Sequence, residues 1–359
     1  MGAFLLRRLT YGIFVLLGVL TLVFVLFTIL PGDPARMVLG QRADMASVEA
    51  IRQELGLNEP LQMQYLHFLN DISPLSFHKN NVKADNWFFE PTKYGTHLVL
   101  FQSSSIVFVL KKPYLRKSYQ SRRNVTDILA EAFPMTLILA SVSMLFAMVA
   151  GVLIGVIAAI INSRLVNRLI LVFSVLGMSL PSFFAAILFA WIFAYVFADY
   201  TGLSMFGSLY EVDDAGRGEV LRLRNLILPA FTLGIRPLAI IVELTRTTLM
   251  EVMSQDYIRT AMAKGLSRTR IIGIHALRNA LNPVITAVSG WFASLMAGAV
   301  FVEYVFDWKG IGVVIVDALE KYDLPVIMGS VLMIAVILIL INIVVDILYG
   351  FLDPRARIA

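Results

Sequence analysis

Cysteine is absent from this chain, and charged side chains are scarce. Without cysteine there is no disulfide framework, no thiol nucleophile and no thiolate metal site. Aspartate, glutamate, lysine and arginine together make up 15% of the 359 residues, whereas a soluble domain carries about 25% charged residues. Hydrophobic residues account for 58% of the chain. This balance predicts an integral membrane protein.

Sequence motifs for nucleotide binding and for catalysis are also missing. The chain contains no GxxxxGK[ST] phosphate loop, no HExxH metal motif and no nucleophile elbow. The four histidines are scattered, without the spacing of paired metal ligands: His67, His78, His97 and His275. We therefore expect no catalytic residue, no metal site and no cofactor in this chain. The net charge of +5 is better explained by basic residues at the inner membrane face than by nucleic-acid binding.

Six apolar runs are each long enough to cross a bilayer, which takes about 20 residues. The first, Leu9–Leu30, follows Arg7 and Arg8, which place the N-terminus in the cytoplasm. A cleaved signal peptide is the alternative, but this run is too long and is followed by PGDP (31–34) rather than by a small-residue cleavage site. The other runs are Pro134–Ile161, Leu169–Ala198, Leu226–Met250, Pro283–Val302 and Pro325–Tyr349. The expected fold class is all-α, with six transmembrane helices.

The charges of the short loops predict how the chain is oriented. The Asn162–Arg168 turn and the loop 251–283 are basic, which predicts the cytoplasmic side. Residues 199–225 and 303–324 are acidic overall, which predicts the outside. Both termini are then cytoplasmic, and residues 134–359 form a five-helix core after the first span (1–30).

The long polar segment 31–133 is expected on the outside. Within it, Ser47–Leu55 predicts a short helix ending at Gly56, and His97–Phe101 and Ile106–Leu110 predict a small β-hairpin. An insertion around residues 71–112 could form a lobe that touches a substrate or a binding protein. The alternative is an insertion that serves only packing.

Few ionisable residues fall within the predicted spans. Arg236 lies beside Pro237, where it could reach the interface, pair with an acid or face an aqueous cavity. Glu243 and Arg246 are spaced to form an ion pair, and Asp346 lies in the last turns of the sixth span. A lone arginine does not make a proton relay, so the spans contain no evident set of residues for an ion-coupled mechanism.

Prolines and small residues within the spans predict bends and close helix packing. Pro181 and Pro237 are expected to bend their spans, and a bend can serve gating. Gly151, Gly155 and Ala159 recur at intervals of four residues, a spacing that lets helices approach closely in lipid. We interpret this spacing first as a packing signal and second as a sign of the solute pathway.

The segment Asp256–Thr286 is a polar, basic stretch between two apolar spans. Residues 255–264 contain good helix formers, Gly265 breaks the helix, and a second helix restarts near Ser267 and Arg268. Its expected apolar side comprises Ile271, Ile274, Ala276, Leu277, Ala280 and Leu281. This pattern predicts a helix–turn–helix protrusion suited to docking on another protein. The alternative is a solvated loop that is basic only because of topology.

This segment resembles the EAA loop of binding-protein-dependent ABC transporter permeases, in its dipeptide/oligopeptide permease variant. The tripeptide 259–261 (RTA) stands where the general pattern has Glu-Ala-Ala, Gly265 matches its glycine, and Asn282-Pro283 replaces a Leu-Pro that comes earlier in that pattern. The PGDP stretch, Leu115–Leu129 and Asp346–Arg355 are similar to the same subfamily. The resemblance covers most of the chain apart from roughly 71–112.

The resemblance implies a type I importer fold in a bacterial inner membrane, with the loop acting as a coupling helix in a groove of a cytoplasmic ATPase subunit. The residues carried over to that contact are Asp256, Tyr257, Arg259, Ala261, Lys264 and Gly265. Gly265 would permit the turn, Ala261 would allow close approach, and Arg259 and Lys264 would pair with acids. The implied partners are a second homologous permease, two ATPase subunits that bind ATP and Mg, an extracytoplasmic solute-binding protein and membrane lipid.

The resemblance also implies the function, which is import of di- or oligopeptides. Nickel chelates and oligosaccharides are alternative solutes, because relatives of this permease type carry them. A different class of function is an autonomous ion-coupled carrier or channel. A third is a scaffold that anchors an ATPase at the membrane without moving a solute.

Overall fold

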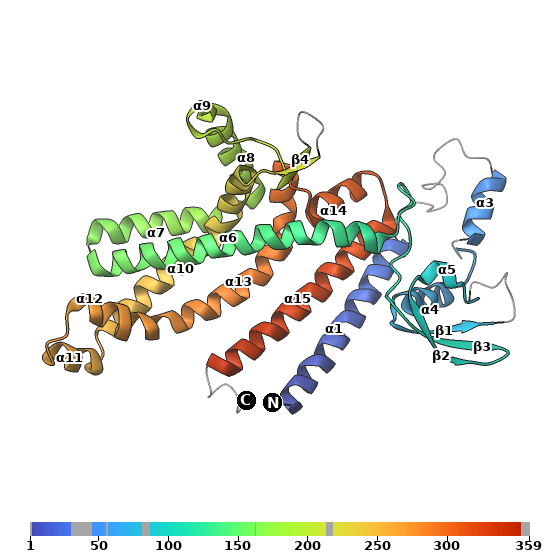
Figure 1. Cartoon of the computed structure of the whole chain (residues 1–359), viewed down its shortest axis with the longest axis horizontal. Helices are drawn as coiled ribbons and strands as arrows, with labels where there is room; N and C mark the ends of the chain where they lie inside the picture. The colour runs from blue at the N-terminus through green and yellow to red at the C-terminus, as the bar shows by residue number, and fades with distance from the viewer. Residues whose placement is uncertain are drawn as a thin grey trace. The chain divides into compact units, whose positions relative to one another are not determined.

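The computed structural model describes residues 2–29, 45–54, 57–80, 87–161, 163–212 and 218–352 (Figure 1). Contacts between residues divide the chain into two compact units. The first comprises Met1–Gly2, Ala132–Val313 and Ile337–Ala359, and the second comprises Ala3–Glu131 and Val314–Val336. The PGDP stretch and residues 353–359, which carry part of the resemblance, lie outside the described residues.

The first unit is built mainly from long helices that run through the predicted spans. They are α6 (Val125–Ile161), α7 (Arg164–Ser179), α8 (Ser182–Trp191) with a π-helical continuation (Ile192–Val196), α10 (Arg224–Met253), α13 (Leu277–Phe306) and α15 (Leu324–Leu352). Shorter elements join them: α9 (Ala198–Thr201), β4 (Tyr210–Val212), β5 (Glu219–Leu221), α11 (Asp256–Ala263), α12 (Arg268–Arg270), a π-helical turn (Ile271–Ala276) and α14 (Ile311–Glu320). Helices α6, α14 and α15 extend into the second unit.

Within the described ranges, four helical segments are long and apolar enough to cross a membrane: Val125–Ile161, Arg224–Met253, Arg268–Ala297 and Leu324–Val345. Helices α7 and α8 with its continuation form a fifth candidate if the pair, which is bent by 109°, counts as one span. The apolar part of α1 (Gly2–Ile29) is shorter and covers Thr10–Leu26. The structure therefore gives a mostly helical chain with four or five candidate spans by these criteria.

The segments that connect the long helices of the first unit lie at two opposite ends of α10 and α13. The Gly207 amide donates to the Phe306 carbonyl over 3.0 Å, so the segment before β4 lies at the end of α13. Arg246 Nε donates to Asn167 Oδ1 over 3.0 Å, so the α6–α7 turn lies near the other end of α10, where α11 follows. With 30 residues, α10 is about 45 Å long at about 1.5 Å per residue. Segments of opposite predicted charge therefore lie at opposite ends of these helices, and the assignment of the ends to inside and outside stays a prediction.

Close contact between α6 and α10 confirms that the small-residue spacing is a packing signal. A Cβ atom on Gly151 would lie 2.7 Å from Cγ2 of Ile241, and one on Gly155 would lie 2.7 Å from Cβ of Thr245. Ala159 packs one turn further along, against a cluster that contains the buried Leu249. The small residues let the two backbones approach without a side chain between them.

The second unit combines α1 with a small α/β lobe. The lobe contains α3 (Met45–Glu54), α4 (Leu61–Ile72), β1 (Leu75–Lys79), α5 (Pro91–Tyr94), β2 (His97–Gln102) and β3 (Ile106–Lys111). The predicted hairpin is confirmed as β2 and β3, and β1 adds a third antiparallel strand in the order β1-β3-β2. The helix predicted at residues 47–55 is confirmed as α3, although Leu55 and Gly56 lie outside the described residues.

Helix α4 packs along α1 and so joins the lobe to an apolar helix. Phe68 is buried in a cluster with Leu20, and its ring lies 5.6 Å from the ring of Phe24. The hydroxyl groups of Thr21 and Tyr65 are 2.6 Å apart and share a hydrogen bond. All three α1 residues fall within its apolar stretch Thr10–Leu26.

The α6–α10 contact yields a stability prediction. In Gly155→Ala the new methyl group would meet the Val242 carbonyl oxygen at 2.8 Å as well as Thr245, and such overpacking costs about 1–3 kcal/mol. The thermal unfolding midpoint of the purified chain should fall. The control is Gly290→Ala in α13, where nothing lies within 4 Å of the added atom; it should leave the midpoint unchanged or slightly raised. Equal midpoints for the two variants would contradict the close approach.

Candidate functional site

Helix α11 is a short amphipathic helix that packs against the C-terminal end of α10 and the N-terminal end of α13. Ile258 is fully buried and Ala261 is nearly so, in a cluster with Leu249 of α10, Ile271 and Ala276. Its remaining residues are exposed. The apolar side therefore fixes α11 to the membrane-spanning helices, while the polar side is left uncovered in this chain.

The uncovered side of α11 brings together five of the six residues assigned to the coupling contact: Asp256, Tyr257, Arg259, Lys264 and Gly265. The carboxylate of Asp256 accepts from Arg259 Nη1 over 3.4 Å, but their side chains are 96% and 73% exposed. Such an exposed pair is weak, so both charges remain available to a partner. The hydroxyl group of Tyr257 accepts from Asn279 Nδ2 over 2.9 Å, which ties α11 to the start of α13.

The sixth residue, Ala261, lies on the packed side instead. We expected Ala261 to allow close approach of another protein, but it faces Ile271 and Ala276 in the buried cluster. Its small side chain lets α11 lie close to its own support. Gly265 has a φ of +78°, a left-handed conformation that favours glycine, and this ends the helix where the sequence predicts.

The helix that follows the turn departs from the predicted 3.6-residue spacing. Ser267 stands at its N-cap, as predicted, but its side chain makes no capping bond. A π-helical turn covers Ile271–Ala276, and each π turn holds one more residue than an α turn. The buried positions are consequently Ile271, Ala276 and Ala280, whereas Ile274, which we placed on the apolar side, is 57% exposed.

Charged residues in the spans are arranged differently from the predicted pairs. Arg246 bonds Asn167 rather than Glu243, and no ion pair between Glu243 and Arg246 is present in the described part of the chain. Glu243 and Arg236 are both exposed on α10. The side chain of Asp346 lies outside the described residues. Within the described ranges no group of three or more histidine, aspartate or glutamate residues is placed to hold a metal ion.

The two prolines singled out in the spans lie in different settings, and the bend is confirmed at Pro181 alone, while a bend at Pro237 stays a prediction. Pro181 stands between α7 and α8, where the chain bends by 109°, which confirms the predicted bend. Pro237 is buried within α10, which is helical without interruption from Arg224 to Met253. A gating role for either proline, or for Arg236, stays a prediction.

Known protein families match both ends of the chain. Residues 151–358, which include α11 and its supporting helices, match the family described as binding-protein-dependent transport system inner membrane component. Residues 1–86 match the family described as the N-terminal part of such a membrane component. The chain belongs to this permease family. It is therefore a multi-pass component of an inner membrane transport system.

Curated relatives cover this permease almost completely. The di/tripeptide transport system permease protein DppB of Pseudomonas aeruginosa (strain UCBPP-PA14) is 34% identical over 99% of both chains. The dipeptide transport system permease protein DppB of Escherichia coli (strain K12) is 32% identical, and the glutathione transport system permease protein GsiC of the same strain is 34% identical, each over 99% of this chain and 98% of the relative. The insertion predicted around residues 71–112 stays a prediction.

One solved structure shares the fold of the permease. It shows inward-facing conformations of the MetNI methionine ABC transporter and matches with a TM-score of 0.50 and 17% identity. The match covers 64% of this chain and 97% of that chain. At this level of identity the likeness concerns the fold alone.

Two acidic residues that we expected in an exposed outer loop of the permease are buried. The carboxylate of Glu303 accepts from the Gly312 amide over 2.6 Å at the start of α14, where a negative charge is favourable. The carboxylate of Asp323 accepts from the Ser118 hydroxyl group and from the Tyr119 amide. Segment 303–324 therefore exposes less negative charge than its composition predicts.

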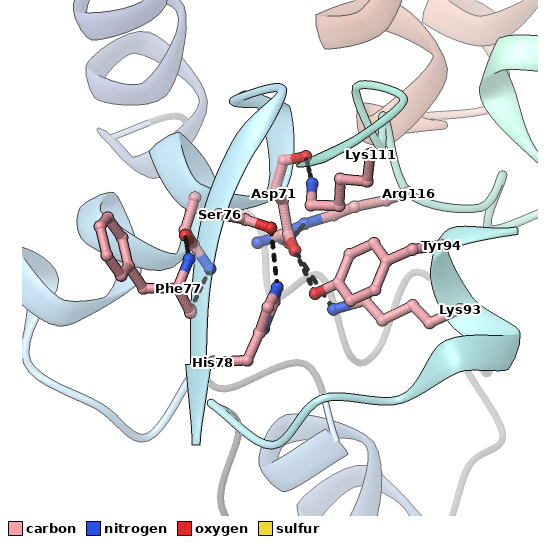
Figure 2. A network of polar contacts seen from close by, with 9 residues as sticks. Asp71, Ser76, Phe77, His78, Lys93, Tyr94, Lys111 and Arg116 are labelled. Carbon is pink, nitrogen blue, oxygen red and sulfur yellow. Dashed lines mark hydrogen bonds and ion pairs between the residues drawn. The ribbon is translucent and has the colours of Figure 1, made fainter. Parts of the chain in front are cut away.

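Sequence reasoning also missed a buried ion cluster around Asp71, at the end of α4 (Figure 2). Its carboxylate accepts from Lys93 Nζ over 3.3 Å and from the Tyr94 hydroxyl group over 3.1 Å, and it lies 3.5 Å from Arg116 Nε. Lys111 Nζ donates to the backbone carbonyl of Asp71. These residues are distant in sequence, so no local motif predicts the cluster.

Burial and neighbouring charges shift the pKa values in this cluster. Burial alone would raise the pKa of Asp71, but the positive charges of Lys93 and Arg116 outweigh burial and hold that pKa below its usual value. Burial lowers the pKa of Lys111 to about 8, against the attraction of Asp71. Burial, helped by Lys111 and Lys93, lowers the pKa of His78 to about 4. His78 is thus neutral in the folded lobe and bonds the buried Ser76 hydroxyl group over 3.0 Å.

The shifted pKa of His78 predicts acid sensitivity of the lobe. As pH falls from 6.5 towards about 4, the unfolded chain binds a proton at this side chain that the folded chain does not, so stability is lost in that window. The loss approaches about 3 kcal/mol, at about 1.4 kcal/mol per pKa unit. Hydrogen exchange of β1, corrected for intrinsic rates, should report less protection at pH 5 than at pH 7.

Variants of two histidines in the same sheet test this prediction. His78→Asn should flatten the dependence on pH between 6.5 and 4, whereas His97→Asn, which alters a half-buried imidazole on β2, should preserve it. The stability that Asp71 contributes is lost at a lower pH than the stability that His78 contributes. The ordinary pKa of Asp71 is 3.8, and its pKa in the folded chain is lower still. A slope that survives in His78→Asn would show that another group is responsible.

Proposed function

We propose that this permease is the membrane-spanning subunit of an ATP-driven importer, with six transmembrane helices and both termini in the cytoplasm. Helix α1 supplies the first span; its 28 residues extend about 42 Å at about 1.5 Å per residue. The alternation of loops along α10 supports the predicted order of inside and outside segments. The polar side of α11 carries the proposal, because it is an exposed surface firmly attached to the spans.

The energy of ATP hydrolysis would be transmitted to the spans through α11. The chain has no phosphate loop of its own, so ATP and Mg would be bound by two cytoplasmic ATPase subunits. Arg259 and Lys264 would meet acidic residues of an ATPase, while Ile258 passes the movement to Leu249 of α10 and to Ile271. In this arrangement Ala261 holds the coupling helix to the spans instead of touching the ATPase.

The solute is proposed to be a di- or oligopeptide brought by an extracytoplasmic solute-binding protein. Support comes from the relatives, which are named for di/tripeptide, dipeptide and glutathione transport. Nickel chelates and oligosaccharides would suit the same architecture and are distinguished by identifying the solute bound to the purified complex.

A second, homologous permease would complete the pathway. Helices α7 and α8 expose large apolar side chains on the outside of the single chain: Leu165, Leu171, Phe173, Leu176, Phe183, Phe184, Ile187 and Trp191. Lipid and a partner permease are the surroundings that such a surface fits in a membrane. Four to six spans are also few to enclose a solute path.

Reconstitution of the purified complex tests the class of function. We expect solute uptake into proteoliposomes to require the ATPase subunits, ATP and the binding protein. Uptake by this chain alone, driven by an ion gradient, would instead identify an autonomous carrier or channel. ATPase binding without solute flux in the complete complex would identify a scaffold.

Charge reversal on α11 tests the coupling surface. In the double variant Arg259→Glu and Lys264→Glu, like charges would face the acids of the ATPase, which costs several kcal/mol. Solute-stimulated ATP hydrolysis should fall by about tenfold or more, while the protein stays in the membrane. Lys309→Glu, an exposed reversal in the α13–α14 turn, is the matched control. Undiminished stimulation in the double variant would count against the coupling role.

The turn after α11 offers a second test of the same surface. Gly265→Asn should retain coupling because asparagine tolerates positive φ, whereas Gly265→Val should lose it. Ala261→Trp should also abolish the coupling of ATP hydrolysis to the solute, because the larger side chain would displace α11 from the buried cluster against which it packs. Equal coupling in the asparagine and valine variants would show that the geometry of the turn does not matter.

A further inference from the structure

The β1-β3-β2 sheet of the lobe has one buried face and one apolar, exposed face. The buried face carries Ser76, His78 and Val109. The other face, called here the apolar sheet face, carries six side chains that are 41–62% exposed: Leu75, Phe77, Leu98, Phe101, Ile106 and Leu110. The strand register places them in rows, with Leu110 between Leu75 and Leu98, and Phe108 between Phe77 and Phe101. A contiguous apolar patch of this kind marks a contact with another apolar surface.

Polar contacts fix the sheet rigidly to α4. The side chain of Asn70 bonds both the amide and the carbonyl of Phe77, over 2.9 and 3.0 Å. Lys111, the last residue of β3, bonds the Asp71 carbonyl, and Asp71 in turn holds Lys93 and Tyr94 at α5 (Figure 2). The sheet, α4 and α5 therefore move as one piece.

Helix α4 places this piece beside the apolar part of α1. Its contacts reach Leu20, Thr21 and Phe24, in the C-terminal part of the stretch Thr10–Leu26. In Figure 1 the sheet lies below α4 and α5, on the side towards which the N-terminal half of α1 runs. The apolar sheet face is thus turned away from α4 and α5. It lies at the level of α1, the proposed first span.

We propose that the apolar sheet face rests in the outer leaflet of the membrane, next to α1. Apolar side chains are also exposed on the neighbouring helices: Leu22 and Val25 of α1 and Leu66 of α4. This inference rests on the proposed placement of α1 as a span and goes beyond the coupling function.

The free edge of the sheet limits how deep it can lie. Among the strands of the described residues, β2 pairs only with β3. Its other edge therefore presents backbone groups that cannot be left unbonded in hydrocarbon. The sheet therefore lies where water still reaches this edge, at a depth of about 5–10 Å. Lipid contact is expected at side-chain tips and not at the backbone of β2.

Spin labels on single cysteines test the lipid contact, because the natural chain has no cysteine. The labelled variants are Leu98→Cys and Phe101→Cys on the apolar sheet face, Leu22→Cys as a lipid-facing reference on α1, and Gln53→Cys as an exposed reference on α3. The assembled importer is placed in nanodiscs of phosphatidylethanolamine and phosphatidylglycerol. Label accessibility is then measured to oxygen, which concentrates in lipid, and to a water-soluble nickel chelate.

We expect the ratio of oxygen to nickel accessibility at residues 98 and 101 to exceed that at Gln53→Cys several-fold, and to stay below that at Leu22→Cys. Nickel accessibility equal to that of Gln53→Cys would place the face in water and overturn the inference. Shielding from both reagents would also overturn the inference, because protein, either the binding protein or a second permease, would then cover the face. Failure of Leu22→Cys to report lipid would instead overturn the proposed topology.

Discussion

The contact of Ile258 with the ends of α10 and α13 joins an exposed surface to helices in lipid. A short helix has little stability alone, since helices of fewer than about 12 residues are marginal in water. The eight residues of α11 are held by burial of Ile258 and Ala261 and by the bond between Tyr257 and Asn279. Any force on the polar side is consequently borne by the spans and not absorbed by a flexible loop.

Charged side chains are placed differently in different segments of the permease. On α11, charged side chains such as Arg259 and Asp256 are solvated and make only weak pairs. In the segments assigned to the outside, Asp71, Glu303 and Asp323 are buried and receive hydrogen bonds from backbone amides, hydroxyl groups or cations. Buried carboxylates of this kind fix a shape, whereas solvated charges remain free to meet a partner.

The elements that depend on local sequence were predictable. Apolar length located the described spans, and helix formers followed by Gly265 located α11 and its end. Two β-prone runs separated by a polar QSSS stretch located the β2–β3 hairpin. The side on which a residue packs was less predictable. Ala261 turned inward and Ile274 outward, the latter because the π-helical turn adds a residue before Ala276.

Contacts between distant residues were the main source of errors. Arg246 was expected to pair with Glu243 within its own helix, but Asn167, 79 residues away, is its partner. Loop composition likewise could not reveal that Glu303 caps α14 or that Asp323 is bonded by the segment after Ser118. The Asp71 cluster draws its cations from α5, β3 and the irregular segment beyond β3, which become neighbours only after folding.

The edge of β2 that no strand of the described residues pairs with has a consequence for handling the purified protein. A micelle lacks a flat interface, and an edge strand with apolar neighbours such as Leu98 and Phe101 is a template for pairing with another copy. Self-association in detergent would then arise from the loss of the bilayer. Oligomers observed in detergent would then result from the detergent as much as from the transporter. The subunit stoichiometry is better measured in lipid.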